Sequence, residues 1–164
     1  MKTKQQAQVT KDLAGNKLVV VREFDAPVDQ VWAAWTQSDI LDQWWAPRPY
    51  KARTKTMNFR EEGFWIYSMV GPDGTVMWCR TDYKTIDPGK SFTATDAFCD
   101  EAGNVSTEFP RMQWLTRFSS TPTGTRVVVE INFSSTADLE KILEMGFEEG
   151  FKAALGNLEE LLEK

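Results

Sequence analysis

The C-terminal stretch from residue 136 to residue 163 constrains the fold more than any other part of the chain. Its apolar positions recur at spacings of three and four residues and are Leu139, Leu143, Phe147, Gly150, Ala154, Leu158 and Leu161. This spacing predicts one amphipathic α-helix, about 40 Å long, capped by Ser135 or Thr136. The polar face of this helix carries Asp138, Glu140, Lys141, Glu144, Glu148, Glu149, Lys152, Asn157, Glu159 and Glu160. A helix with a single apolar face needs an apolar surface to cover, and the preceding residues predict a sheet.

Upstream of this helix, apolar residues mostly alternate with polar ones, which is typical of β-strands. The predicted strands are 17–25, 51–60, 63–70, 75–86, 90–99, 111–119 and 125–133, and two short helices, 28–36 and 39–45, follow the first strand. Turns rich in Gly and Pro separate the later strands, and such short connections favour antiparallel pairing. The predicted fold class is therefore α+β, a seven-stranded antiparallel sheet wrapped around the long C-terminal helix. Residues 1–16 are predicted to be a flexible arm, and residues 17–164 a single domain.

Length and charge narrow the function classes. The chain has 164 residues and a net charge of −5, and it contains no basic run. This length suits one domain with a substantial core, and the acidic balance argues against a nucleic-acid-binding protein. The first residues lack the apolar core of a signal peptide, and no apolar run is long enough to span a membrane. We therefore expect a cytoplasmic protein in which Cys79 and Cys99 are reduced.

The absence of histidine restricts the chemistry. Without histidine there is no Ser-His-Asp or Cys-His nucleophile system and no His-based metal site. An enzyme would have to use carboxylates, Tyr, Lys or Arg as acid and base. No two carboxylates have a spacing that indicates a glycosidase pair, and no glycine-rich turn has the sequence of a phosphate loop. We predict no metal, no cofactor and no catalytic residue.

Aromatic residues are the other unusual feature, with seven Trp and ten Phe. Gly146 and Gly150 interrupt the apolar face of the C-terminal helix beside Phe147 and Phe151, so a concave sheet over this segment could enclose a cavity. The candidate ligand-binding residues are Trp44, Trp65, Tyr67, Met69, Tyr83, Asp96, Phe98, Trp114, Phe147 and Phe151. Ordinary core packing is the alternative for each aromatic residue. Trp44 is interpreted either as a gate at one end of the cavity or as a hydrophobic plug.

Asp96 is the most informative charged residue. Alternation along 90–99 places it on the inward face between Ala94 and Phe98. A buried carboxylate without a partner has a raised pKa, and such a group could act as a general base or bind a ligand hydroxyl. The other interpretation, which we favour from the sequence, is a structural ion pair with a basic residue such as Arg22.

Several separated blocks resemble one bacterial family. REFDAPVDQVWAAWTQSDILDQWWAP (22–47), FREEGFWIYSMVGPDG (59–74), the segments 86–88 and 95–98, Gly124-Thr125-Arg126, and EMGFEEGFKAALGNLEELL (144–162) occur in the family's order. The family is named after the activator of a heat-shock chaperone ATPase. The order of the predicted elements likewise resembles the helix-grip fold of the START and birch-pollen-allergen-like superfamily.

This resemblance implies three functions. The first is the binding, without catalysis, of an apolar or amphipathic small molecule between the sheet and the long helix. The second is an enzyme of the cyclase, aromatase or hydrolase type that uses Asp96, Tyr67 or Tyr83. The third is a chaperone-interacting module, for which the chain lacks the second domain of the eukaryotic namesake. The sequence leaves the oligomeric state open.

Overall fold

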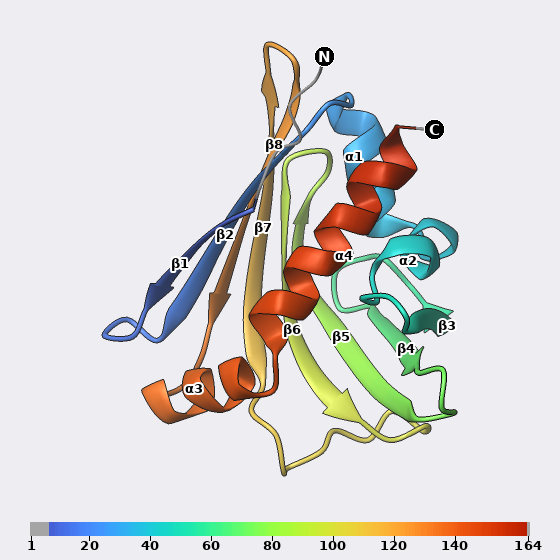
Figure 1. Cartoon of the computed structure of the whole chain (residues 1–164), viewed down its shortest axis with the longest axis vertical. Helices are drawn as coiled ribbons and strands as arrows, with labels where there is room; N and C mark the ends of the chain where they lie inside the picture. The colour runs from blue at the N-terminus through green and yellow to red at the C-terminus, as the bar shows by residue number, and fades with distance from the viewer. Residues whose placement is uncertain (1–6, 164) are drawn as a thin grey trace.

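The computed structural model describes residues 7–163. The described elements run in the order β1 (Gln8–Asp12), β2 (Lys17–Phe24), α1 (Val28–Thr36), α2 (Ser38–Trp44), β3 (Lys51–Met57), β4 (Phe64–Val70), β5 (Val76–Asp87), β6 (Ser91–Cys99), β7 (Met112–Thr121), β8 (Gly124–Asn132), α3 (Thr136–Glu144) and α4 (Phe147–Leu162). The predicted α+β class and helix-grip arrangement are confirmed, because α4 runs across the concave face of the sheet (Figure 1). No helix among residues 7–163 is both long enough and apolar enough to cross a membrane.

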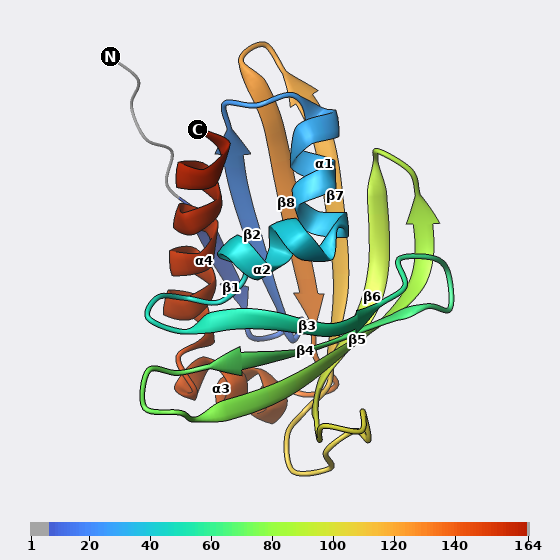
Figure 2. The ribbon, with the colours of Figure 1, turned by 90° about the vertical axis from the view of Figure 1, so that its right-hand side faces the viewer.

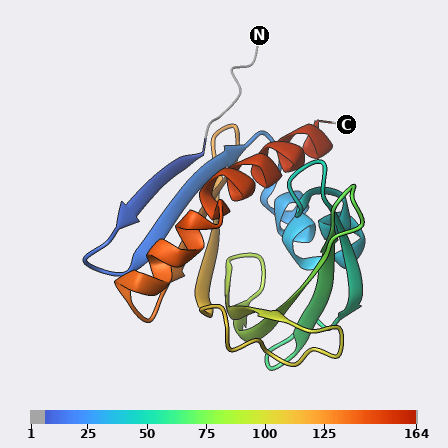
Figure 3. The same ribbon diagram turned by 60° about the horizontal axis from the view of Figure 1, so that its bottom comes forward.

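The strands form one antiparallel sheet in the order β1-β2-β8-β7-β6-β5-β4-β3. Strands β3 to β8 follow each other as a meander, and β2 then pairs with β8, which places Val20 opposite Val129. Figure 2 shows how far the sheet curves between β2 and β3. Figure 3 shows the sheet curling around an interior that α4 covers on one side and α1 and α2 occupy at the other. The candidate site lies between strands β4 to β7 and the break between α3 and α4.

The prediction of a flexible arm over residues 1–16 is wrong for residues 8–12, which form the first strand. Residues Gln8–Asp12 pair with β2, with Gln8 opposite Val21, and thus add an eighth strand to the predicted seven. Alternation in this segment is weak, but Val9 packs against the core. The tight turn after β1 is closed by the Gly15 amide, which donates to Asp12 Oδ1 at 2.9 Å. Residues 1–6 of the predicted arm lie outside the described residues.

The predicted single C-terminal helix is in fact two helices, α3 and α4. Ser135 caps α3 as predicted, because its side chain accepts a hydrogen bond from the Asp138 amide at 3.1 Å. The break falls at Gly146, whose φ of +85° is in the left-handed region that glycine adopts without strain. The apolar positions keep their helical spacing across Gly146, so the spacing alone did not reveal the change in helix direction.

Asn157 is also placed differently from the prediction, which put it on the solvent face of the helix. It is buried, and its amide nitrogen donates to the carbonyl oxygen of Ala46 at 3.1 Å and to that of Trp44 at 3.5 Å. These bonds tie the end of α2 to α4. Asn157 thereby fixes one wall of the space between the helix and the sheet.

Candidate functional site

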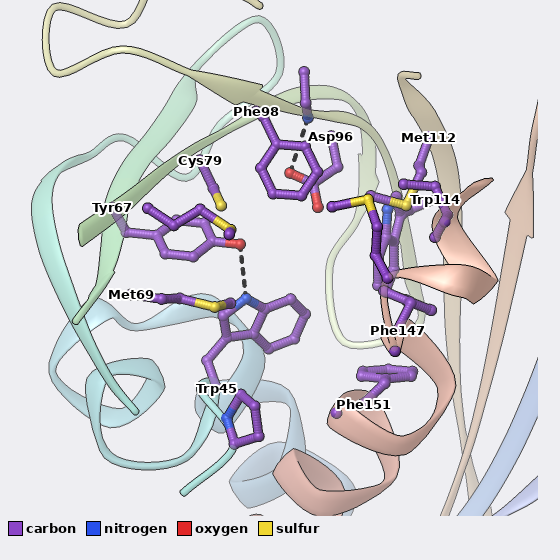
Figure 4. Close-up of a pocket in the computed structure, with 17 residues that line it drawn as sticks. Trp45, Tyr67, Met69, Cys79, Asp96, Phe98, Met112, Trp114, Phe147 and Phe151 are labelled. Atoms are coloured by element: carbon purple, nitrogen blue, oxygen red, sulfur yellow. Dashed lines mark hydrogen bonds between the residues drawn. The ribbon is translucent and has the colours of Figure 1, made fainter. Parts of the chain in front are cut away.

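A cavity of about 200 Å³ lies between strands β4 to β7 and the break between α3 and α4 (Figure 4). The strands contribute Tyr67, Met69, Met77, Cys79, Asp96, Ala97, Phe98, Met112 and Trp114. The facing helices and loops contribute Trp45, Pro47, Ile142, Met145, Gly146, Phe147, Gly150 and Phe151. The lining is almost entirely apolar and rich in aromatic rings and thioethers, a composition that suits an apolar ligand.

The structure brings together most of the predicted site residues. Those that line the cavity are Tyr67, Met69, Asp96, Phe98, Trp114, Phe147 and Phe151. Two others, Trp65 and Tyr83, line a smaller neighbouring space of about 30 Å³. Asp96, Trp114 and Trp45 border both spaces. The predicted residues therefore fall into two groups, and Asp96 and Trp114 belong to both.

Trp44 is the predicted site residue that lines neither space. It is a buried core residue, its indole N–H donates to the carbonyl oxygen of Ala34 at 2.9 Å, and its ring packs edge-on against Trp35. Trp45 faces the cavity instead. Successive side chains of a helical segment point roughly 100° apart, so only one of two adjacent indoles can face a given wall. The interpretation of Trp44 as a gate is wrong.

Hydrogen bonds and ring stacking hold the walls in place. The Trp45 indole donates to the Tyr67 hydroxyl at 2.9 Å and so connects the α2–β3 loop to β4 (Figure 4). Tyr67 stacks on Trp65, with ring centroids 4.0 Å apart. On the helical side, Phe147 and Phe151 stack at 5.6 Å, and Trp114 meets Phe151 edge-on at 5.5 Å. Each wall therefore consists of rings that fix one another's orientation.

Asp96 is the charged residue of the cavity. Its Oδ1 accepts hydrogen bonds from Thr81 Oγ1 and from the Ala97 amide, both at 3.1 Å. Burial raises the pKa of the Asp96 carboxyl to about 7, against the opposing effect of these two bonds. The favoured pairing with Arg22 is wrong, because Arg22 Nη1 bonds Glu159 Oε1 at 3.1 Å. Among residues 7–163, Asp96 therefore has no cationic partner.

The other ionisable groups of the cavity are held neutral. Burial raises the pKa of the Tyr67 hydroxyl and that of the Cys79 thiol well above their usual ranges. Cys79 is thus a polarisable wall atom and a poor nucleophile. Cys79 pairs with Phe98 across the sheet, while Cys99 pairs with Trp78, so the two sulfurs lie on opposite faces. Both cysteines are free, as predicted.

Sequence reasoning missed several lining residues: Trp45, Met77, Cys79, Met112, Ile142 and Met145. Alternation along β5 and β7 was sufficient to place Met77, Cys79 and Met112 on the inner face with Trp114. Met145 had no such signal, because it follows α3 at a break that the sequence did not reveal. Within residues 7–163, no group of three or more Cys, Asp and Glu side chains could hold a metal ion.

Comparisons with known proteins agree with this architecture. Residues 25–163 match the family model described as Activator of Hsp90 ATPase homolog 1-like protein. A crystal structure of a protein from Mycobacterium smegmatis is 30% identical, with a TM-score of 0.88, over 94% of this chain and 95% of that chain. A solution NMR structure of a protein from Arthrobacter aurescens is 31% identical, with a TM-score of 0.90, over 95% of this chain and 91% of that chain. No functionally curated protein matches the sequence. The chain belongs to the family of Activator of Hsp90 ATPase homolog 1-like proteins.

Proposed function

We propose that the chain binds a small apolar or amphipathic molecule in the cavity between β4–β7 and the α3–α4 break, and that it does so without chemical conversion. The observation that carries this proposal is the cavity lining, in which rings and methionines from facing elements surround an unfilled volume of about 200 Å³. Well-packed cores leave few voids larger than a water molecule, so a volume of this size in an apolar lining is suited to a ligand.

The volume sets the size of the ligand. Drug-sized ligands occupy pockets of about 300–1,000 Å³, so this cavity suits a single ring system or a short chain. Met77 and Met145 border it and are 43% and 42% exposed, which gives the cavity an apolar rim at the surface. Their unbranched side chains can change rotamer as a ligand enters.

An acid–base enzyme is the second candidate, and Asp96 is the observation that favours it. A carboxyl with a pKa of about 7 exchanges protons readily near neutral pH, which is the property of an efficient general base. Tyr67 and Tyr83, with raised pKa values, would serve as hydrogen-bond donors to a substrate. Recovery of the ligand unchanged after prolonged incubation distinguishes binding from turnover.

Contact with a chaperone is the third candidate and rests on the family description. Such a contact would use the exposed apolar side chains Val76, Met77 and Met145. Because Met77 and Met145 also border the cavity, ligand and chaperone would compete for them. We retain the cytoplasm as the proposed compartment.

The test of the proposed function is a paired measurement on two glycine variants of α4. A Cβ at Gly150, which lines the cavity, would lie 3.6 Å from Pro47 Cγ, an ordinary contact. A Cβ at Gly156 would meet nothing within 4 Å. Gly150→Phe should keep the wild-type melting temperature within a few degrees and weaken ethylbenzene binding, followed by Trp fluorescence, at least about tenfold. Gly156→Phe, the matched control, should bind like wild type. Absence of ethylbenzene binding in the wild type would contradict the proposal.

A further inference from the structure

Trp114 carries an unpartnered hydrogen-bond donor at the cavity. Among residues 7–163, its indole Nε1 is the only buried side-chain nitrogen or oxygen without a hydrogen-bond partner. The side chain is held edge-on against Phe147 and Phe151 and borders both internal spaces. A buried N–H without an acceptor costs about 1–3 kcal/mol, so its persistence calls for a reason in the function of the site.

Asp96 presents an unused acceptor to the same cavity. Both of its hydrogen bonds end on Oδ1, and no hydrogen bond of the described residues reaches Oδ2. In Figure 4 the bonded oxygen is joined by a dashed line to a backbone amide, and the other oxygen points toward the space between Cys79 and Trp114. Asp96 is only 7% exposed, so this oxygen is largely removed from bulk solvent.

The register of the sheet brings this donor and this acceptor to one place. Asp96 lies opposite Met112, and Trp114 lies opposite Ala94, so Asp96 and Trp114 are diagonal neighbours on adjacent strands. Side chains in this relationship point to the same face and are about 7–8 Å apart at the backbone. Because Trp114 Nε1 is itself buried, a small polar group placed between the two side chains contacts both once a small rotation of the indole turns its N–H toward the cavity.

We propose that the cavity recognises the hydroxyl group of an otherwise apolar, uncharged ligand, which donates to Asp96 Oδ2 and accepts from Trp114 Nε1–H. This inference rests on the proposed function and specifies its ligand class. A hydroxyl is one donor and one acceptor on a single atom, which is what the two unused groups require. The rest of such a ligand, a ring or short chain, contacts the aromatic and thioether walls.

An ammonium, a ketone and a carboxylate each leave at least one of the two partners unsatisfied. An ammonium has donors only and leaves the Trp114 N–H unpaired, while a ketone has acceptors only and leaves Asp96 Oδ2 unpaired. A carboxylate ligand would lie beside Asp96 in a lining that contains no Lys or Arg among its described residues. A hydrocarbon of the same shape leaves both groups as they are in the free protein.

The test uses four molecules of one shape: ethylbenzene, 1-phenylethanol, acetophenone and protonated 1-phenylethylamine. At about pH 8.5, above the pKa of about 7 of the Asp96 carboxyl, Asp96 is ionised, and the wild type should bind 1-phenylethanol more tightly than acetophenone and the amine. Trp114→Phe keeps the ring and removes the N–H. It should reduce the preference for 1-phenylethanol over ethylbenzene by about two- to tenfold, the range expected for one hydrogen bond. Trp78→Phe, which removes an indole that lines neither space, should leave the preference unchanged.

Asp96→Asn gives a second and independent outcome. The bonds from Thr81 and Ala97 hold the amide oxygen at the position of Oδ1, so the amide nitrogen replaces Oδ2 and an acceptor becomes a donor. The variant should therefore prefer acetophenone to 1-phenylethanol, the reverse of the wild type. Equal binding of all four molecules, or a preference that neither variant changes, would overturn this inference and leave the proposed function intact. Failure of all four to bind the wild type would overturn the proposed function itself.

Discussion

Arg22 Nη1 lies 3.1 Å from Glu159 Oε1, and both side chains are largely buried where β2 meets α4. The same nitrogen donates to the Glu23 carbonyl oxygen at 3.1 Å, and the guanidinium lies over the Phe24 ring. This ion pair fixes the C-terminal half of α4 against the sheet. Strands β8 and β7 separate Arg22 from Asp96 in the sheet. Among the described residues, the Asp96 carboxyl has hydrogen bonds from Thr81 and Ala97 but no ion pair.

Arg22→Met should lower the free energy of unfolding by about 3 kcal/mol or more, because it leaves the Glu159 carboxylate without a partner in a low-dielectric position. Chemical denaturation measures this loss. The more exposed pair between Lys17 and Glu130, at 3.2 Å, provides the control, and Lys17→Met should cost less than about 1 kcal/mol. Restoration of most of the lost stability is expected in the double variant Arg22→Met/Glu159→Leu. Equal losses of unfolding free energy in Arg22→Met and Lys17→Met would show that the pair between Arg22 and Glu159 contributes no more to stability than the exposed pair.

Asp96 should make stability depend on pH in a defined direction. Its folded pKa of about 7 is above its ordinary value of 3.8, so unfolding releases a proton between these two pH values. The free energy of unfolding therefore falls as pH rises through this window, by up to roughly 1.4 kcal/mol per pH unit, and the loss is complete above the folded pKa. Asp96→Asn removes this contribution. Its stability relative to wild type should rise between about pH 4 and pH 7 and then level off. A constant difference across that range would show that the Asp96 carboxyl titrates normally.

Gly146→Ala tests the break between α3 and α4. An alanine at a φ of +85° is strained, so the variant should lose about 1 kcal/mol of stability even though a Cβ there meets nothing within 4 Å. Gly156→Ala, within α4 and equally free of contacts, should instead gain about 0.5–1 kcal/mol from helix propensity. Thermal unfolding of the pair gives the comparison. A stabilising effect at both positions would mean that residues 136–163 can form one continuous helix.

Local pattern predicted most of this fold, because strands such as β7 and β8 have one face in the core and their alternation is visible in the sequence. The predictions that failed concern residues whose environment is set by segments distant in the sequence. Edge pairing of Gln8–Asp12 depends on the open side of β2, which no pattern within residues 8–12 reveals. Asn157 is buried because two carbonyl groups distant in sequence need a donor.

At the candidate site, too, periodicity predicted which residues face inward but not which distant residues they contact. Periodicity placed Tyr67, Trp114 and Phe151 correctly on inward faces, because burial has the period of the element. It could not choose between Trp44 and Trp45, since the choice depends on where α2 ends. It could not assign a partner to Arg22 either, because Glu159 and Asp96 are both acidic and only the crossing of α4 over β2 decides between them.

The most direct test of the ligand-binding cavity is an NMR titration with ethylbenzene that follows the methionine methyl groups. Met69, Met77, Met112 and Met145 line the cavity, whereas Met57, at the end of β3, does not. The ring current of a bound aromatic molecule should shift the first four methyl resonances in a saturable manner and leave that of Met57 unchanged. Shifts that are absent, or that spread equally to Met57 without saturation, would contradict the account and identify these residues as ordinary core and surface.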